Sequence, residues 1–257
     1  MSLKFTHFNY FAPFITLLAL LFLACAEIQK PTTACKGVDK CSLDKKCLAK
    51  ECEQKNAFSC KLLADEYWYD GEPMDCFRQT DTKQARLYYQ KACDLGFAEG
   101  CEGLGYTMNE KNLCSDESVV HFEKACAMDK TGEICGGIGT SCEIVENYKQ
   151  ALRFFAKACD LKYANACKDK GVLLLYLYDT QYTKEALEFF NKGCEFGYFG
   201  SCEYLAVLYK EGIYGVKQDL DRAKKYYQKS CDLRKWSECD GFERITCKLF
   251  ECKESVK

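Results

Sequence analysis

The stretch KACDLGFAEGCEGLGY, residues 91–106, places two cysteines eight residues apart around a glycine. The same pattern returns as KACDLKYANACKDKGV at 157–172, KGCEFGYFGSCEYLAV at 192–207 and KSCDLRKWSECDGFER at 229–244. Self-similarity at a fixed period is typical of repeat architectures and has to be recognised before any other feature is interpreted. The chain is therefore expected to fold as an array of similar units.

The cysteines give the period of the array. The first cysteine of each unit follows the previous one after 41, 33, 33, 35 and 37 residues, and a lysine stands two residues before each. These leading cysteines are Cys52, Cys93, Cys126, Cys159, Cys194 and Cys231. A partner follows eight residues later in every unit except one, where it is nine residues away: Cys60, Cys101, Cys135, Cys167, Cys202 and Cys239.

Each unit has the pattern of two helices. An alanine stands eight residues before the leading cysteine in four units, and aromatic pairs such as Phe154-Phe155 stand five and four residues before it. This spacing predicts an apolar stripe on a helix that ends at the cysteine, and a second stripe begins at the partner cysteine. Two helices joined by so short a turn form an αα-hairpin, and a disulfide across the turn is worth about 2.5 kcal/mol in the chain-entropy model. Because one hairpin cannot bury its own stripe, we expect an all-α solenoid of about six hairpins, each closed by a disulfide, over residues 44–257 with a C-terminal cap.

The N-terminus predicts export. A lysine at position 4 precedes the apolar run FAPFITLLALLFLACA, which is typical of a secretory signal peptide over residues 1–26, followed by an extension over 27–43. Cleavage after Ala26 would release a secreted or periplasmic protein. Acylation of Cys25 would instead give a lipid anchor, and only this route, or an uncleaved anchor helix, would place the chain at a membrane.

The composition agrees with an oxidising compartment. The chain has 21 cysteines among 257 residues, a number that is rare in the reducing cytosol. Eight of them have no assigned partner: Cys35, Cys41, Cys47, Cys76, Cys114, Cys142, Cys247 and Cys252. Eight cysteines allow 105 connectivities, so only a loose guess, Cys247–Cys252, is made. The net charge of −2 gives no support for nucleic-acid binding.

The segment CEYLAVLYKEGIYGVKQDLDRAKKYYQKSC, residues 202–231, resembles the Sel-one-like repeat, a relative of the tetratricopeptide repeat. With the paired cysteines and the signal peptide, the chain is similar to the Helicobacter cysteine-rich protein family. The resemblance covers residues 44 to 245 and implies a right-handed solenoid with a concave inner face. It also implies an exported protein associated with penicillin binding and slow β-lactam hydrolysis (a β-lactamase), or with host interaction.

The residues themselves do not assemble a catalytic site. The mature chain keeps one histidine, His121, which is expected to be a packed helix residue, and no C-x-x-C is present, so no metal or other cofactor is predicted. The β-lactam link directs attention to SLDK (Ser42 to Lys45), YAN (Tyr163 to Asn165) and KTG (Lys130 to Gly132). KTG precedes YAN, the reverse of the usual order of these two penicillin-recognition motifs, and KTG is expected in a turn, so the match is interpreted as chance.

Binding is the better-founded function. The resemblance implies that the helix opened by each second cysteine lines the concave face. Mapped onto this sequence, its ligand-facing positions are Lys61, Asp65, Trp68, Glu102, Tyr106, Asn109, Asn165, Lys168, Tyr204 and Lys210. The expected partners are a peptide, a peptidoglycan fragment or a host protein, with β-lactams as the alternative.

Overall fold

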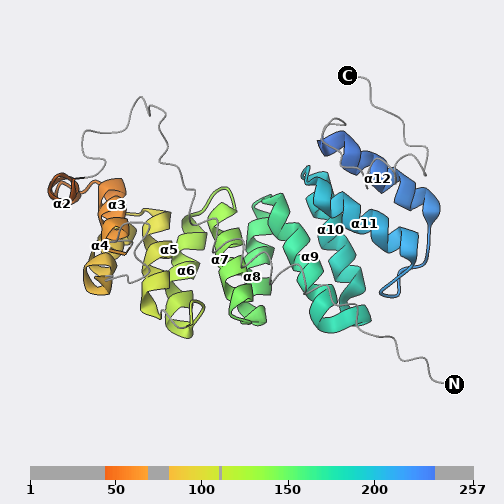
Figure 1. The fold of residues 1–257 in the computed structure, drawn as a ribbon, viewed down its shortest axis with the longest axis horizontal. Coiled ribbons are helices and arrows are strands. Elements are labelled where there is room, and N and C mark those ends of the chain that lie inside the picture. Colours follow the sequence, from red (N-terminus) through yellow and green to blue (C-terminus); the bar gives the residue numbers. More distant parts are fainter. Residues whose placement is uncertain (1–43, 69–80, 110–111, 235–257) are drawn as a thin grey trace, which may run out of the picture.

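The computed structural model describes residues 44–68, 81–109 and 112–234, and within these ranges all regular structure is helical. The helices follow one another in sequence order along the long axis of the molecule (Figure 1). They are α2 (Lys45–Glu53), α3 (Ala57–Trp68), α4 (Thr82–Asp94), α5 (Ala98–Met108), α6 (Asp116–Met128), α7 (Glu133–Ile144), α8 (Tyr148–Asp160), α9 (Ala164–Tyr178), α10 (Thr183–Glu195), α11 (Phe199–Glu211) and α12 (Leu220–Arg234). A 3₁₀ turn, η1 (Asp179–Tyr182), separates α9 from α10. The predicted αα-hairpin solenoid is confirmed.

The turn explains the spacing of eight residues. Helix α4 ends one residue after Cys93, and Gly96 then adopts a left-handed φ of 83°. The backbone N–H of Phe97 donates to the carbonyl of Ala92 at 3.0 Å, which closes the helix end as a Schellman-type motif does. Helix α5 begins at Ala98, so Cys101 lies in its first turn, directly across from Cys93. The equivalent left-handed residue is Gly197 between α10 and α11 and Lys162 between α8 and α9.

Five intra-hairpin disulfides cross these turns. They are Cys52–Cys60, Cys93–Cys101, Cys126–Cys135, Cys159–Cys167 and Cys194–Cys202. Their Cα–Cα distances lie between 4.5 and 4.9 Å, within the usual range for a disulfide. Cys231 is buried near the end of α12, and its expected partner Cys239 lies outside the described residues, as do Cys247 and Cys252.

A further disulfide, Cys114–Cys142, joins the loop before α6 to the C-terminal half of α7. The Asn147 side-chain amide donates to the Cys114 carbonyl at 2.9 Å and holds the same loop. The sequence had left both cysteines without a partner. Their sequence separation of 28 exceeds that of the intra-hairpin disulfides, so the chain-entropy model assigns this bond a larger stabilisation, about 3.5 kcal/mol.

We therefore expect the double substitution Cys114→Ala/Cys142→Ala to lower the free energy of unfolding by about 3 kcal/mol or more, and Cys159→Ala/Cys167→Ala to lower it by about 2.5 kcal/mol. Guanidinium unfolding of the oxidised proteins, followed by circular dichroism, measures both. The reverse order of the two losses would show that loop length does not set the contribution of these bonds.

Consecutive hairpins are held together by a phenylalanine ring that packs against a glycine. Phe122, Phe155 and Phe190, each four residues before a leading cysteine, are fully buried. They face Gly105, Gly139 and Gly171 on the preceding helix, and a Cβ added to these glycines would lie 2.4, 2.6 and 2.7 Å from the ring. Such distances are far below van der Waals contact, so glycine is required for this approach.

Two glycines on α7 allow a matched test. Gly139→Ala should lower the free energy of unfolding by about 1–3 kcal/mol, because the new methyl group overlaps the Phe155 ring. Gly137→Ala should raise it by up to about 1 kcal/mol, since alanine favours the helix and the nearest atom to its Cβ is Glu102 Oε1 at 3.8 Å. Urea unfolding measures both, and a gain in stability for Gly139→Ala would refute the packing argument.

The repeated lysine and aspartate also bridge hairpins. Lys124 Nζ lies 3.4 Å from Asp94 Oδ1, and Lys192 Nζ lies 3.4 Å from Asp160 Oδ1. In each case the lysine stands two residues before the leading cysteine of its hairpin. The aspartate directly follows the leading cysteine of the preceding hairpin. The pairs are well exposed, so each adds only a few tenths of a kcal/mol.

The odd-numbered helices form the inner side of the array. Each of α3, α5, α7 and α9 contacts the next odd-numbered helix, whereas contacts between successive even-numbered helices are weak or absent except for α8 with α10. Helices that approach more closely lie on the inside of a curved array. The inner helices are therefore those opened by the second cysteine of each pair, as the resemblance to the tetratricopeptide repeat implies.

Candidate functional site

The structure places the ten predicted groove residues on or directly after inner helices, and none of them is buried. Asn165 and Tyr204 are exposed and the other eight are partly exposed. They do not form one site. Four of them, Lys61, Asp65, Glu102 and Tyr106, line a single open pocket between α3 and α5.

The α3 side of this pocket is held by a small polar network. Lys61 Nζ pairs with Asp65 Oδ2 at 2.7 Å one turn further along α3. The Tyr89 hydroxyl, from the outer helix α4, donates to Asp65 Oδ1 at 2.6 Å. Asp65 is therefore engaged on both oxygens, and this fixes the wall of the pocket.

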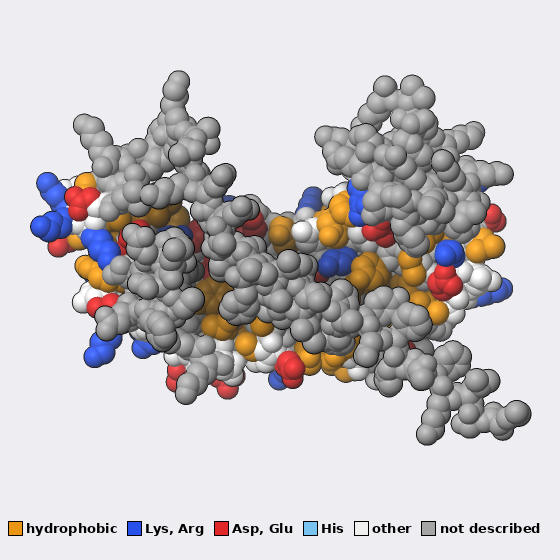
Figure 2. Space-filling model, viewed as in Figure 1, with side chains coloured by type: hydrophobic (Ala, Val, Ile, Leu, Met, Phe, Trp, Pro, Cys, Tyr) orange, Lys and Arg blue, Asp and Glu red, His pale blue; other side chains and the backbone are white. Residues whose placement is uncertain are grey.

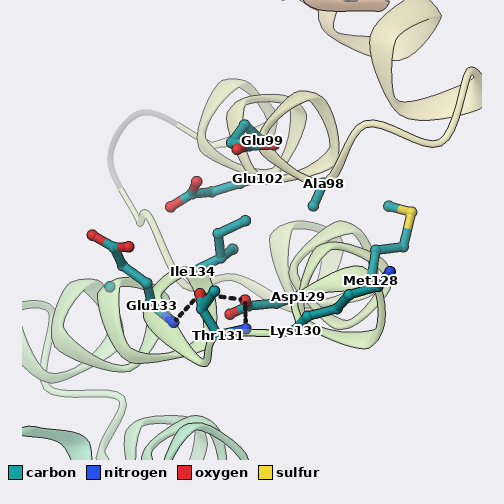
Figure 3. Close-up of a pocket in the computed structure, with 10 residues that line it drawn as sticks. Ala98, Glu99, Glu102, Met128, Asp129, Lys130, Thr131, Glu133 and Ile134 are labelled. Carbon is teal, nitrogen blue, oxygen red and sulfur yellow. Dashed lines mark hydrogen bonds between the residues drawn. The ribbon is translucent and has the colours of Figure 1, made fainter. Parts of the chain in front are cut away.

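A second pocket adjoins the first between α5 and α7, with a volume of about 720 Å³. Figure 3 shows Glu102 reaching from α5 toward the α6–α7 turn, with Glu99 on the same helix and Glu133 on the other side of the opening. Glu99 and Glu102 line both pockets. We call the two pockets together the α3–α7 groove.

The α7 wall was missed by the sequence mapping. Gly137 lines the second pocket, and its missing side chain leaves room opposite Glu102. The Ser141 Oγ lies 2.9 Å from the Tyr106 hydroxyl and joins α7 to α5. The one feature of the sequence that distinguishes α7 is the spacing of Cys135 from Cys126, which is nine residues and not eight. This spacing shifts the residues of α7 by one position relative to the other inner helices.

The turn at the bottom of this pocket is fixed by Asp129. Its Oδ1 accepts from the Thr131 N–H at 2.9 Å (Figure 3) and from the Gly132 N–H at 3.0 Å, and its Oδ2 accepts from the Cys135 N–H at 3.1 Å. These hydrogen bonds lower the pKa of Asp129, although its burial acts in the opposite direction. Asp129 thus caps the start of α7 and stays ionised.

Glu102 is the electrostatically unusual group of the groove. Burial raises the pKa of Glu102 to about 7, against the weaker effects of the Tyr106 hydrogen bond and of Lys61, which lower it. The Tyr106 hydroxyl lies 3.4 Å from Glu102 Oε1. Because the pKa of Glu102 in the folded protein lies above its ordinary value, folding favours the protonated carboxyl. The free energy of unfolding therefore falls as the pH rises through 7 and the carboxyl ionises.

Glu102→Gln should therefore stabilise the fold at pH 8, by at most roughly 3 kcal/mol, and leave stability at pH 4 almost unchanged. The exposed Glu188 on α10 supplies the control, because Glu188→Gln should change stability little at either pH. Urea unfolding of the three proteins at both pH values measures this. Equal effects of Glu102→Gln at pH 4 and pH 8 would contradict the assignment.

The remaining predicted residues lie elsewhere or have structural roles. Trp68 packs against the cluster around Ala85 and Tyr89. The Asn109 side chain accepts the N–H of Asn112 at 3.0 Å and shapes the loop after α5. Asn165, Lys168, Tyr204 and Lys210 lie on α9 and α11, outside the lining of the α3–α7 groove.

The α9–α11 residues mostly contact one another or their neighbours. Lys168 forms an ion pair with Asp169, and the pKa of Lys168 is raised by this pair although burial lowers it. The Tyr204 ring stacks on Phe190 with centroids 5.1 Å apart. Lys210 Nζ pairs with Glu211 Oε1 at 2.8 Å. This part of the inner face is polar, but it has less unpaired charge than the α3–α7 groove.

Of the motifs considered for β-lactam chemistry, KTG lies on a turn and YAN lies at the N-terminus of α9. Lys130–Gly132 forms the α6–α7 turn, where the Thr131 hydroxyl donates to Asp129 Oδ1 at 2.9 Å. A Cβ at Gly132 would lie 2.7 Å from the Cβ of Tyr163, so the KTG and YAN turns are neighbours, as turns of consecutive hairpins must be. Ser42 lies outside the described residues. His121 is half-buried on α6, and burial lowers its pKa.

Within the described ranges, no three His, Cys, Asp or Glu side chains lie close enough together to hold a metal ion. The same residues contain no helix with the length and apolar character needed to cross a membrane. On the face seen in Figure 2, the basic and acidic side chains are interspersed with apolar ones.

The Sel1 repeat family model matches residues 57–97, 127–163 and 200–234. Each matched segment pairs an inner helix with the outer helix that follows it. No curated protein matches the chain.

Several solved structures are similar to this one. A protective antigen of uropathogenic Escherichia coli strains with an SLR fold is 17% identical, with a TM-score of 0.47 over 80% of this chain and 47% of its own. This chain thus spans about half of that antigen. A Sel1 repeat protein from Oxalobacter formigenes is 18% identical, with a TM-score of 0.44 over 70% of this chain and 74% of its own. The TPR protein YrrB, described as having an unusual peptide-binding site, is 20% identical, with a TM-score of 0.44 over 80% of this chain and 99% of its own.

Proposed function

We propose that this protein is an exported binding scaffold that holds an extended peptide or protein segment in the α3–α7 groove. The observation that carries the proposal is the adjoining pair of open pockets on three successive inner helices, with Glu99 and Glu102 shared between them. A surface built from equivalent positions of stacked helices suits an extended ligand, because each helix supplies one set of contacts along it.

The groove is shaped before any ligand arrives. Asp65 is held by Lys61 and Tyr89, and Tyr106 contacts Ser141 across the α5–α7 boundary. The disulfides Cys93–Cys101 and Cys126–Cys135 fix the turns that carry α5 and α7. Side chains ordered in advance lose little entropy on binding, which favours affinity.

The disulfides indicate an oxidising, extracytoplasmic location. The route remains part of the proposal: the apolar N-terminal run supports removal of residues 1–26 and release, with acylation of Cys25 as the alternative. The intact mass of the mature protein distinguishes the two, since diacylation or triacylation of Cys25 adds a lipid mass that cleavage after Ala26 does not.

β-Lactam hydrolysis, which the resemblance to the Helicobacter cysteine-rich family implies, is not part of the proposal. Of the three motifs, the described residues hold two in full: KTG forms the α6–α7 turn, and YAN spans the N-cap and the first two residues of α9. The Thr131 hydroxyl is already hydrogen-bonded to Asp129. Nothing in this arrangement activates a serine.

Peptide binding is tested with a displayed library of linear peptides, selected on the oxidised protein. Gly137→Leu should weaken the selected peptides at least about tenfold, because the new side chain enters the second pocket where only Glu102 Oε1 lies within 4 Å of its Cβ. Lys149→Leu, on the outer helix α8, is the matched control and should bind as the unchanged protein does.

Circular dichroism melting establishes that both variants are folded. If no peptide is enriched, or if Gly137→Leu binds the enriched peptides as well as the control does, the groove is not the binding surface.

A further inference from the structure

We infer that the α3–α7 groove takes a basic side chain of its ligand, a lysine or an arginine, between α5 and α7. This inference rests on the proposed function, and it names the chemistry of the segment that is bound. It is carried by three features of the second pocket: unpaired carboxylates at its opening, an apolar wall beneath them, and nearby cations that are already engaged or directed to solvent.

The carboxylates come from two helices. Glu99 and Glu102 project from α5, and Glu133 stands at the start of α7 (Figure 3). Among the described residues, no ion pair involves any of the three; the only side-chain hydrogen bond to them comes from the Tyr106 hydroxyl to Glu102. Asp129 does not compete for a ligand, since its oxygens accept four hydrogen bonds at the α7 N-terminus.

The cations that line the groove do not neutralise these groups. Lys61 is paired with Asp65 at 2.7 Å. Lys130 is exposed on the α6–α7 turn. Even with Glu102 neutral, the carboxylates of Glu99, Asp129, Glu133 and Asp65 outnumber these two lysines, so the lining of the groove carries an excess of negative charge. A cation bound beside Glu102 would favour its ionised form.

The walls fit the rest of a basic side chain. Ala98, Met128 and Ile134 line the pocket together with the carboxylates. A lysine or arginine stem is a chain of methylene groups that packs on apolar surface while its charged end reaches polar groups. Gly137, opposite Glu102, leaves the space that such a stem needs. A neutral polar side chain of the ligand would not neutralise the carboxylates, and an acidic one would be repelled by them.

The test uses the oxidised full-length protein and an array of linear peptides taken from the same selection. Each peptide is presented as selected, with each lysine or arginine replaced in turn by glutamine, and with lysine replaced by acetyl-lysine. Replacement of one basic residue should weaken binding about tenfold, which corresponds to the loss of one charge-assisted contact. Binding of the basic peptides should also weaken as salt is raised from 0.05 to about 0.5 M.

Glu102→Gln and Glu99→Gln provide the protein side of the test. Both keep the size of the side chain, and Glu102→Gln is expected to leave the fold intact, so lost binding reports lost charge. Each should bind the basic peptides several-fold more weakly and reduce the difference between the lysine and acetyl-lysine forms. Glu188→Gln on α10, an exposed glutamate far from the pocket lining, should behave as the unchanged protein.

The outcomes separate this inference from the proposed function. Peptides that depend on groove residues but bind equally well with acetyl-lysine or glutamine would overturn the inference and leave the binding scaffold standing. A preference for basic residues that survives in both glutamate variants would place the contact elsewhere and also overturn it. If no peptide depends on the groove at all, the proposed function and the inference fail together.

Discussion

The array depends on one contact, an aromatic ring of an outer helix set against a glycine of the inner helix before it. Phe122, Phe155 and Phe190 make this contact with Gly105, Gly139 and Gly171. Each ring buries a large apolar area, and the glycine lets the two helices approach closely. Within the matched segment 127–163 the Gly139–Phe155 contact joins α7 to α8, whereas the disulfide Cys159–Cys167 joins α8 to α9. Packing and covalent bonds therefore alternate along the chain.

The fold could be predicted from the sequence because each unit repeats the same local signals. Ala151, the pair Phe154-Phe155 and Cys159 all lie on one buried face of α8, as their spacing of three to four residues requires. The partner of Cys114 could not be predicted in the same way. Its pairing with Cys142 occurs once, spans a whole hairpin and depends on how the loop before α6 lies against α7.

The groove was predicted in part, for a physical reason. Positions such as Lys61, Asp65, Glu102 and Tyr106 project from inner helices whose register the cysteines fix, so their side of the groove could be placed. On α7 the second cysteine comes one residue late, and two residues that shape this side are small: Gly137 lines the second pocket, and Ser141 contacts Tyr106. Small residues carry no recognisable binding signal. Trp68 and Asn109 were assigned to the ligand because residue type alone does not distinguish a packed or turn-forming side chain from a free one.

The connectivity of the disulfides bears on how the chain is made. The intra-hairpin disulfides of the described residues join cysteines only 8 or 9 positions apart, and Cys114–Cys142 encloses just one such pair. Loops of about ten residues close within roughly 10–100 ns, so partner thiols meet long before distant parts of the chain have emerged. Oxidation of these pairs can therefore proceed in order from the N-terminus as the chain enters an oxidising compartment. Because the partners of the intra-hairpin disulfides in the described ranges lie this close in sequence, their thiols have little occasion to exchange into wrong pairs.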